Sequence, residues 1–161
     1  MSNLIIKPLG SPEEAHTCAR MMARSEPWIS LERGYEESLE ILTEPSREVY
    51  LAWIPEEIVG FIIIEMNGIF KGYIKSICVS QDQRGKGIGS SLMQHAEKRI
   101  FSEAPNVFLL VSDFNYRARK FYKSLGYEEI GEFKDFIVRG YSEVLMRKTQ
   151  GPLTEYPMNE R

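Results

Sequence analysis

A glycine-rich segment, Gln83–Ser90, lies between an apolar run and an amphipathic stretch. Residues 73–80 before it predict a strand, and the stretch after it predicts a helix because apolar residues recur at Ile88, Leu92, Ala96 and Ile100. Glycine permits positive φ angles and lets the backbone approach a ligand, while a helix start directs unpaired N–H groups at one point. This order of strand, loop and helix predicts part of an α/β sheet, with a site for an anion such as phosphate at the loop.

Hydrophobic periodicity extends this unit into a single domain. Strands are expected over residues 4–9, 47–54, 58–66, 73–80, 107–111, 128–138 and 143–148, and helices over 12–24, 31–42, 88–100 and 115–125. The run Val107–Val111 is apolar throughout, which predicts a strand buried on both faces. The predicted fold is α/β (α+β), with a mixed sheet of about seven strands, about four helices and the order β-α-α-β-β-β-α-β-α-β-β. The domain is expected over residues 1–148, followed by a loose tail over 149–161.

Composition narrows the classes of function. The chain has 161 residues, of which 43% are hydrophobic and 27% charged, as is typical of a soluble globular domain. A net charge of -3 argues against nucleic acid as a partner. No run approaches the roughly 18 apolar residues of a membrane helix, and no signal peptide is recognisable, so we expect a cytoplasmic protein without a membrane partner. Cys18, Cys78 and the two histidines lack the spacing of metal ligands, so no metal is expected.

The glycine loop can be compared with three phosphate-binding patterns. The pattern Gly-x-x-x-x-Gly-Lys-Ser/Thr requires a lysine after the last glycine, whereas Lys86 lies among the glycines. The dinucleotide pattern Gly-x-Gly-x-x-Gly does not fit glycines at positions 85, 87 and 89 in the middle of the chain. Arg84, Gly87 and Gly89 match a third pattern, Arg-x-x-Gly-x-Gly. A glycine turn without a ligand is the alternative, because short glycine motifs often occur by chance.

A second motif begins at Asn115 and runs Asn-Tyr-Arg-Ala-Arg-Lys-Phe-Tyr-Lys-Ser-Leu-Gly-Tyr. By itself it predicts a helix that Asn115 caps and Gly126 ends. That interpretation gives no reason for the phenol of Tyr122, since any aromatic side chain would pack there. Together, Arg84-x-x-Gly-x-Gly and Asn115-x-x-Ala-x-x-Phe-Tyr-x-x-x-Gly-Tyr resemble the GNAT superfamily of acyl-CoA-dependent N-acyltransferases. The resemblance covers roughly residues 1–148 and includes the order of the elements.

The resemblance implies a site for acetyl-CoA (coenzyme A) as co-substrate. Members of the superfamily hold it in a gap between two diverging parallel strands, here the strand that ends at Val79 and the strand over 107–111. The resemblance implies that the backbone of Ile77 and Val79 pairs with the pantetheine arm, that Asn115 contacts this arm and that loop N–H groups hold the pyrophosphate. The expected cofactor-binding residues are Ile77, Cys78, Val79, Arg84, Gly85, Lys86, Gly87, Ile88, Gly89, Ser90, Asn115 and Tyr122.

The resemblance also implies transfer of the acetyl group to a primary amine of a small molecule or peptide, by direct attack in a ternary complex. The backbone N–H of Val79 would stabilise the oxyanion, and the Tyr122 hydroxyl would protonate the leaving sulfur. Cys78 is expected to be a small buried apolar side chain rather than a nucleophile. A non-catalytic module that only binds acyl-CoA is the alternative function.

The resemblance does not identify the general base. A lysine-like amine with a pKa of roughly 10.4 must lose a proton before it attacks. Tyr73 and Leu110 occupy positions where some relatives hold a glutamate, and neither is a base at neutral pH. The remaining carboxylates are Asp113 and Glu65. Glu65 is the candidate base, so Glu65→Gln is expected to lower turnover at neutral pH without changing acetyl-CoA affinity; a water chain is an alternative.

The acceptor amine is expected between the loop that joins the first two helices and the closing hairpin. The loop holds Trp28 between Glu26 and Glu32, a set that could receive a cation, although Trp28 is more simply explained as a core residue. Hairpin residues 133–136 are a second candidate wall. Dimers are common among relatives, so a homodimer formed through the sheet edge or the hairpin is also considered.

Overall fold

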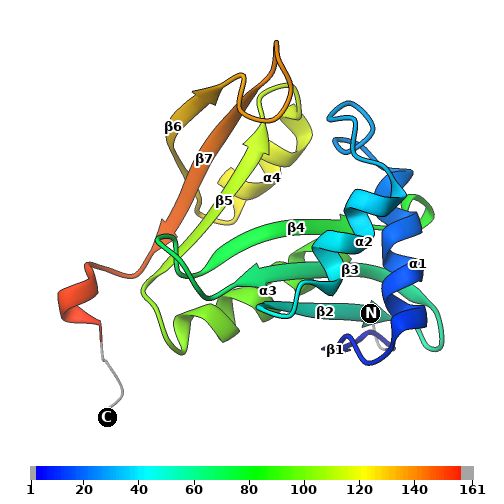
Figure 1. Cartoon of the computed structure of the whole chain (residues 1–161). Helices are drawn as coiled ribbons and strands as arrows, with labels where there is room; N and C mark the ends of the chain where they lie inside the picture. Colours follow the sequence, from blue (N-terminus) through cyan, green and yellow to red (C-terminus); the bar gives the residue numbers. More distant parts are fainter. Residues whose placement is uncertain (1–2, 157–161) are drawn as a thin grey trace.

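The computed structural model describes residues 3–156 and contains one seven-stranded sheet in the order β1-β2-β3-β4-β5-β7-β6 (Figure 1). The strands are β1 Ile5–Pro8, β2 Arg47–Trp53, β3 Ile58–Glu65, β4 Tyr73–Val79, β5 Asn106–Ser112, β6 Glu128–Lys134 and β7 Ser142–Thr149. The α-helices are α1 Pro12–Ala23, α2 Tyr35–Thr43, α3 Ile88–Phe101 and α4 Tyr116–Ser124. All neighbouring strands are antiparallel except β4 and β5, which are parallel. The predicted mixed fold is therefore confirmed.

Helices cover both faces of the sheet around β3. Seven consecutive residues of β3, from Ile58 to Ile64, are buried, because α3 packs on one face and α1 with α2 on the other. The prediction that residues 107–111 are buried on both faces is wrong. Phe108 and Leu110 of β5 are only half-buried, because Leu110 borders an open cavity and Phe108 packs against the exposed Phe70 rather than against a helix.

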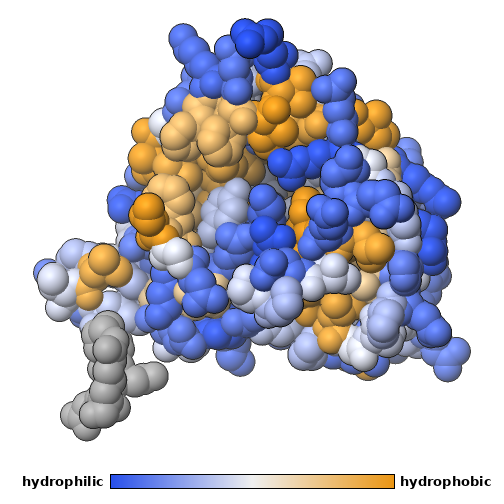
Figure 2. Space-filling model, viewed as in Figure 1, coloured by the Kyte–Doolittle hydropathy of each residue, from blue (hydrophilic) through white to orange (hydrophobic). Residues whose placement is uncertain are grey.

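The two parallel strands are paired for only a short distance. The register pairs Tyr73 with Phe108 and Ile74 with Leu109, and beyond these residues β4 and β5 separate. The register of β3 against β4 shifts at the same point, where Lys75 is an extra residue, and such a bulge increases the local twist of a strand. Figure 1 shows the result: β5, β7, β6 and α4 form an arm that leans away from β1–β4. Hydrophobic residues gather over this arm in Figure 2.

The second helix begins later than the periodicity predicted. α2 starts at Tyr35, and residues 24–32 form turns, so Leu31 is buried outside the helix. The reason is local. Gly34 is the extended N-cap, its N–H donates to the Glu37 carboxylate at 3.1 Å, and Glu32 just before it has a positive φ of 58°.

The closing hairpin and the tail also differ from prediction. β6 ends at Lys134 rather than residue 138, because Asp135 takes a positive φ of 52° and its side chain accepts a hydrogen bond from Gly140 N–H. Thr149 belongs to β7 rather than to a tail, and the N–H of Gln150 donates to Pro105 O at 2.9 Å. The last part of the predicted tail, 157–161, lies outside the described residues. Between residues 3 and 156, none of the helices has the length and apolar composition needed to cross a bilayer.

Candidate active site

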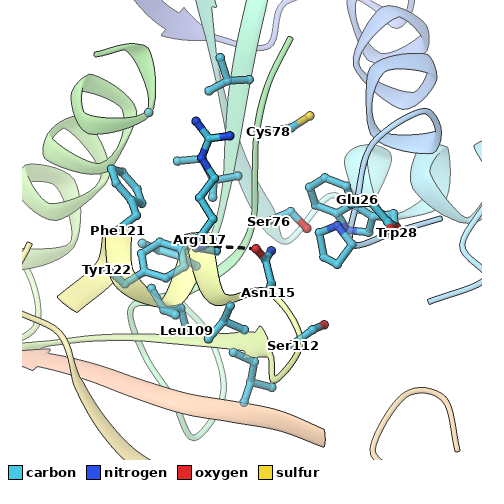
Figure 3. Close-up of a pocket in the computed structure, with 18 of the residues that line it drawn as sticks. Glu26, Trp28, Ser76, Cys78, Leu109, Ser112, Asn115, Arg117, Phe121 and Tyr122 are labelled. Atoms are coloured by element: carbon cyan, nitrogen blue, oxygen red, sulfur yellow. Dashed lines mark hydrogen bonds between the residues drawn. The ribbon is translucent and has the colours of Figure 1, made fainter. Parts of the chain in front are cut away.

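The separation of β4 from β5 opens a cavity of about 600 Å³ (Figure 3). Its floor is formed by the two strands, and its two ends differ in structure. One end is bordered by the glycine loop and the start of α3, and the other by residues 26–33, the start of β7 and the hairpin loop. A cavity of this size suits a small ligand or the reactive part of a larger one. Of the twelve expected cofactor-binding residues, Lys86 is the one that does not line it.

The glycine end presents backbone N–H groups. Gly85 and Gly87 have positive φ angles of 77° and 85°, which a side chain would disfavour, and Gly87 is the N-cap of α3. No side chain caps this helix, so the N–H groups of its first turn are free for an anion, and the helix dipole adds a partial positive charge. Ile88, Gly89 and Ser90 of this turn line the cavity. The loop therefore has the local structure of a phosphate site.

Cationic side chains surround the glycine end. Arg84 Nε donates to Val79 O at 3.2 Å and so ties the loop to the end of β4. Arg117, at the start of α4, points into the cavity (Figure 3). Arg117 was not among the candidates named from sequence. Its place two residues after Asn115, in the first turn of α4, was the available signal.

The β4 edge that faces the cavity has unpaired backbone groups. Ser80 N–H donates to Val59 O of β3 at 2.8 Å. Because N–H groups alternate in direction along a strand, those of Ile77 and Val79 point away from β3, toward the side from which β5 has separated. An extended ligand can therefore add to this edge as a strand would.

Helix α4 positions an amide and a phenol. Asn115 Oδ1 accepts from Ala118 N–H at 3.2 Å and so caps the helix. Tyr122 is 8% exposed and lines the cavity, and among residues 3–156 its hydroxyl forms no hydrogen bond. Burial, with a smaller contribution from Tyr73, raises the pKa of Tyr122, so the phenol stays protonated at neutral pH. Figure 3 shows Phe121 and Tyr122 on the side of the cavity opposite Trp28.

Cys78 and Trp28 both pack within the hydrophobic core. Burial raises the pKa of Cys78 to about 11, and its thiol lies 3.8 Å from Ser25 Oγ. A thiol that stays protonated is a poor nucleophile, which agrees with the expected role of Cys78 as a buried apolar residue. Trp28 is buried within the core cluster of α1 and α2 and also borders the cavity. Glu32 does not line the cavity, and the carboxylate of Glu26 accepts hydrogen bonds from Ser30 N and Oγ at 2.8 and 2.6 Å.

A buried carboxyl, Glu143, lies at the acceptor end of the cavity. It is 4% exposed, faces Ser112 across the β5–β7 ladder and accepts a hydrogen bond from Ser112 Oγ at 2.8 Å. Burial is the largest cause of its raised pKa, the Asp113 carboxylate adds to it, and the Ser112 hydrogen bond and Arg33 oppose it. Glu143 was not among the candidates named from sequence. The available signal was a glutamate directly before the apolar run Val144–Met146.

The two carboxylates named from sequence lie elsewhere. Glu65 accepts from Arg47 Nε at 2.7 Å, and neither Glu65 nor Asp113 lines the cavity. The Glu65 carboxylate is thus occupied by Arg47 and lies outside the cavity in which the reaction would take place. Glu65 therefore stays a prediction that the geometry does not favour, and Glu143 takes its place as the carboxyl beside the β4–β5 gap.

Comparison with known proteins identifies the family. The model of the acetyltransferase (GNAT) family matches residues 15–127. The chain belongs to this family. An uncharacterized N-acetyltransferase of Methanocaldococcus jannaschii is 33% identical over 110 residues, which are 65% of this chain and 70% of that protein. An N-alpha-acetyltransferase of Sulfolobus acidocaldarius is 30% identical over 121 residues, 67% of this chain and 72% of its own length.

Solved structures share the GNAT fold at low sequence identity. An aminoglycoside 6'-N-acetyltransferase complexed with coenzyme A matches with a TM-score of 0.73 and 20% identity, over 92% of this chain and 98% of that chain. A spermidine/spermine N-acetyltransferase of Vibrio cholerae matches with a TM-score of 0.70 and 16% identity, over 92% and 94% of the two chains. The protein is thus a GNAT acyl-CoA-dependent acetyltransferase that uses acetyl-CoA, as the two sequence motifs predicted.

Proposed function

We propose that this GNAT protein transfers the acetyl group of acetyl-CoA to a primary amine by direct attack within a ternary complex. The observation that supports this most is one continuous cavity that joins the glycine loop to a buried phenol, Tyr122, and a buried carboxyl, Glu143. The relative named an N-alpha-acetyltransferase supports an amine acceptor. A homodimer stays a prediction.

Acetyl-CoA would lie across the gap with its phosphates at the glycine end. The N–H groups from Arg84 to Ser90 would hold the pyrophosphate, and Arg117 would add a cation. The pantetheine arm would run along the open edge of β4 and pair with the backbone of Ile77 and Val79. In this arrangement the thioester would lie between β4 and α4, close to Tyr122.

The amine would approach from the acceptor end and lose its proton to Glu143. Its nitrogen then attacks the carbonyl carbon, and the N–C bond forms as the carbonyl oxygen becomes an oxyanion. The N–H of Val79 points into the gap and would donate to this oxyanion. When the C–S bond breaks, the sulfur takes the proton of the Tyr122 hydroxyl, and the nitrogen releases the second proton that it carries after attack, which restores the phenol through solvent. Glu143 returns the first proton to solvent. We place Glu143 rather than Glu65 as the base, because Glu143 borders the cavity while Glu65 is paired with Arg47.

The experiment is an assay of thiol release from acetyl-CoA with a panel of primary amines, with products identified by mass spectrometry. We expect at least one amine to gain one acetyl group for each thiol released. Binding of acetyl-CoA without release by any amine would contradict catalysis and indicate the acyl-CoA-binding module instead.

A further inference from the structure

Two cationic side chains at the acceptor end of the cavity form no salt bridge within residues 3–156. Arg33 precedes the N-cap of α2, Lys75 is the extra residue of the β4 bulge, and both line the cavity. Among residues 3–156, neither side chain forms a salt bridge or a hydrogen bond. Arg33 is held by its backbone, whose N–H donates to Trp28 O at 2.9 Å.

The two carboxylates that line the cavity with these cations, Glu26 and Glu143, and Glu65 near Lys75 already accept hydrogen bonds from other residues. Glu65 accepts from Arg47, and both oxygens of Glu26 accept from Ser30. Glu143 accepts from Ser112 Oγ at 2.8 Å, and Arg33 acts on it as a nearby charge without a hydrogen bond or salt bridge. Each of these carboxylates has a closer partner.

The two cations also oppose each other. Burial lowers the pKa of Lys75, the positive charges of Arg33 and Arg47 lower it further, and the Glu65 carboxylate opposes these effects only in part. Unpaired like charges in a half-buried site are unfavourable unless an anion binds between them. The surroundings of Lys75 are therefore those expected of a site that binds an anion.

The phosphates of acetyl-CoA are too far away to be this anion. Lys75 precedes Val79 by four residues, or about 13 Å along an extended strand, and the glycine loop lies beyond Val79. The cofactor would thus occupy the glycine end and leave Arg33 and Lys75 to the acceptor.

We propose that Arg33 and Lys75 bind a carboxylate on the acceptor, so that the substrate is a small amino carboxylate such as a free α-amino acid. This deepens the proposed function and rests on it. The planar guanidinium of Arg33 suits two parallel hydrogen bonds to a carboxylate, and Lys75 adds a point charge. The amine of the same molecule would face Glu143. Because the pantetheine arm shares the cavity of about 600 Å³, little room is left for a long acceptor.

The same cations select against other acceptors. A polyamine would bring further positive charge toward Arg33 and Lys75, and like-charge contacts reduce affinity. An amino acid amide would leave the Arg33 guanidinium without a charged partner. The proposal therefore predicts an order of acceptors: amino carboxylates first, their amides next, and spermidine last.

The test compares L-amino acids with their C-terminal amides, with spermidine and with peptides that begin with Asp or Glu, in the thiol-release assay. We expect kcat/KM for the best amino acid to exceed that for its amide by about tenfold to a hundredfold, the range of a charge-assisted hydrogen bond. In Arg33→Gln this ratio should fall toward one, and in Arg33→Lys and Lys75→Met it should be intermediate. Arg20→Gln, on the exposed side of α1, is the matched control.

Each outcome decides the proposal. A ratio unchanged by Arg33→Gln, equal use of acids and amides, or preference for spermidine or acidic peptides would overturn the carboxylate site while the proposed acetyltransferase function stands. If no amine is acetylated, the proposed function fails. The site is then judged by calorimetric titration of amino acids into the CoA complex: binding weakened by Arg33→Gln supports it, and lack of binding overturns it.

Discussion

The two ends of the cavity are built in different ways. The glycine end comes from one continuous segment, Arg84–Ser90, and it would hold phosphate through backbone N–H groups. The acceptor end is assembled from side chains of five separate parts of the chain: residues 26–33, β4, the end of β5, the hairpin loop and the start of β7. The first end would bind its ligand through backbone N–H groups, which do not titrate. The second end would act through side chains, of which Glu143 and Lys75 titrate.

Because the two ends differ in this way, substitutions at each end should have different effects. Changes at the glycine end act on backbone angles and access, so they should weaken acetyl-CoA binding at every pH. Changes at the acceptor end act on proton transfer and charge, so they should alter turnover and its pH dependence while cofactor binding persists. Tyr122 lies where the two ends meet.

The largest effect on turnover is expected from Glu143→Gln. The amide keeps the shape of the side chain but cannot accept a proton, so kcat/KM at pH 7 should fall by about 100-fold or more. The wild-type rate should rise with pH through the raised pKa of Glu143, and this limb of the profile should disappear in the variant. The dissociation constant of acetyl-CoA, measured by calorimetry, should not change.

Glu132→Gln is the matched control, because Glu132 is exposed on the neighbouring strand β6. Loss of turnover in both variants, or in neither, would remove Glu143 from the mechanism. Loss of acetyl-CoA binding in Glu143→Gln would contradict the separation of the two ends.

A smaller loss of turnover is expected from Tyr122→Phe. Removal of the hydroxyl leaves the sulfur to depart without its proton donor, so kcat should fall by about 10-fold to 100-fold. Since the ring remains, the packing against Phe121 and Tyr127 and the affinity for acetyl-CoA should be preserved. Tyr116→Phe, on the same helix but 74% exposed, should retain wild-type kcat. Equal kcat values in wild type and Tyr122→Phe would exclude the phenol as the acid.

Glu143 should also lower the free energy of unfolding at neutral pH. Its pKa is raised in the folded state, so its contribution to stability is present below the ordinary carboxyl pKa and is lost as pH rises through the raised value. Glu143→Gln should therefore melt a few degrees higher than wild type at pH 7, and the gap should narrow toward pH 4 when measured by calorimetric scanning. A variant that is both slower and less stable at pH 7 would indicate a structural role instead.

The smallest effect is expected from Glu65→Gln, which distinguishes the base named from sequence from the one that the structure favours. Loss of the ion pair with Arg47 should reduce the free energy of unfolding by about 1 kcal/mol or less, because both side chains are partly exposed. Denaturant titration measures this change. A fall in kcat/KM as large as that of Glu143→Gln would instead make Glu65 the base.

The glycine end could be predicted from sequence because its chemistry is local. Gly85, Gly87 and the start of α3 are neighbours in the chain, so spacing alone reports the positive φ angles and the free N–H groups. The order of the elements followed from periodicity for the same reason. Predicted helix and strand boundaries were wrong where a single residue changed the backbone conformation, as Gly34 does before α2 and Asp135 does after β6.

The acceptor end could not be predicted because it depends on register. Glu143 meets Ser112 through the β5–β7 ladder, across 31 positions of the sequence, and no local pattern records that pairing. Glu65 was the candidate base named from sequence, and only the β2–β3 ladder shows that it lies beside Arg47. The wrong prediction for the half-exposed face of β5 has the same cause, because the apolar run in the sequence does not show that β4 separates from β5.

The most direct test of this account is calorimetric titration of acetyl-CoA into wild type, Gly87→Trp and Gly68→Trp. Both glycines have positive φ angles and open space around the missing Cβ, but only Gly87 lines the cavity, while Gly68 lies in the exposed turn between β3 and β4. We predict that wild type and Gly68→Trp bind equally and that Gly87→Trp does not bind. Equal binding by all three, or no binding by folded wild type, would contradict the assignment of the β4–β5 gap as the acetyl-CoA site.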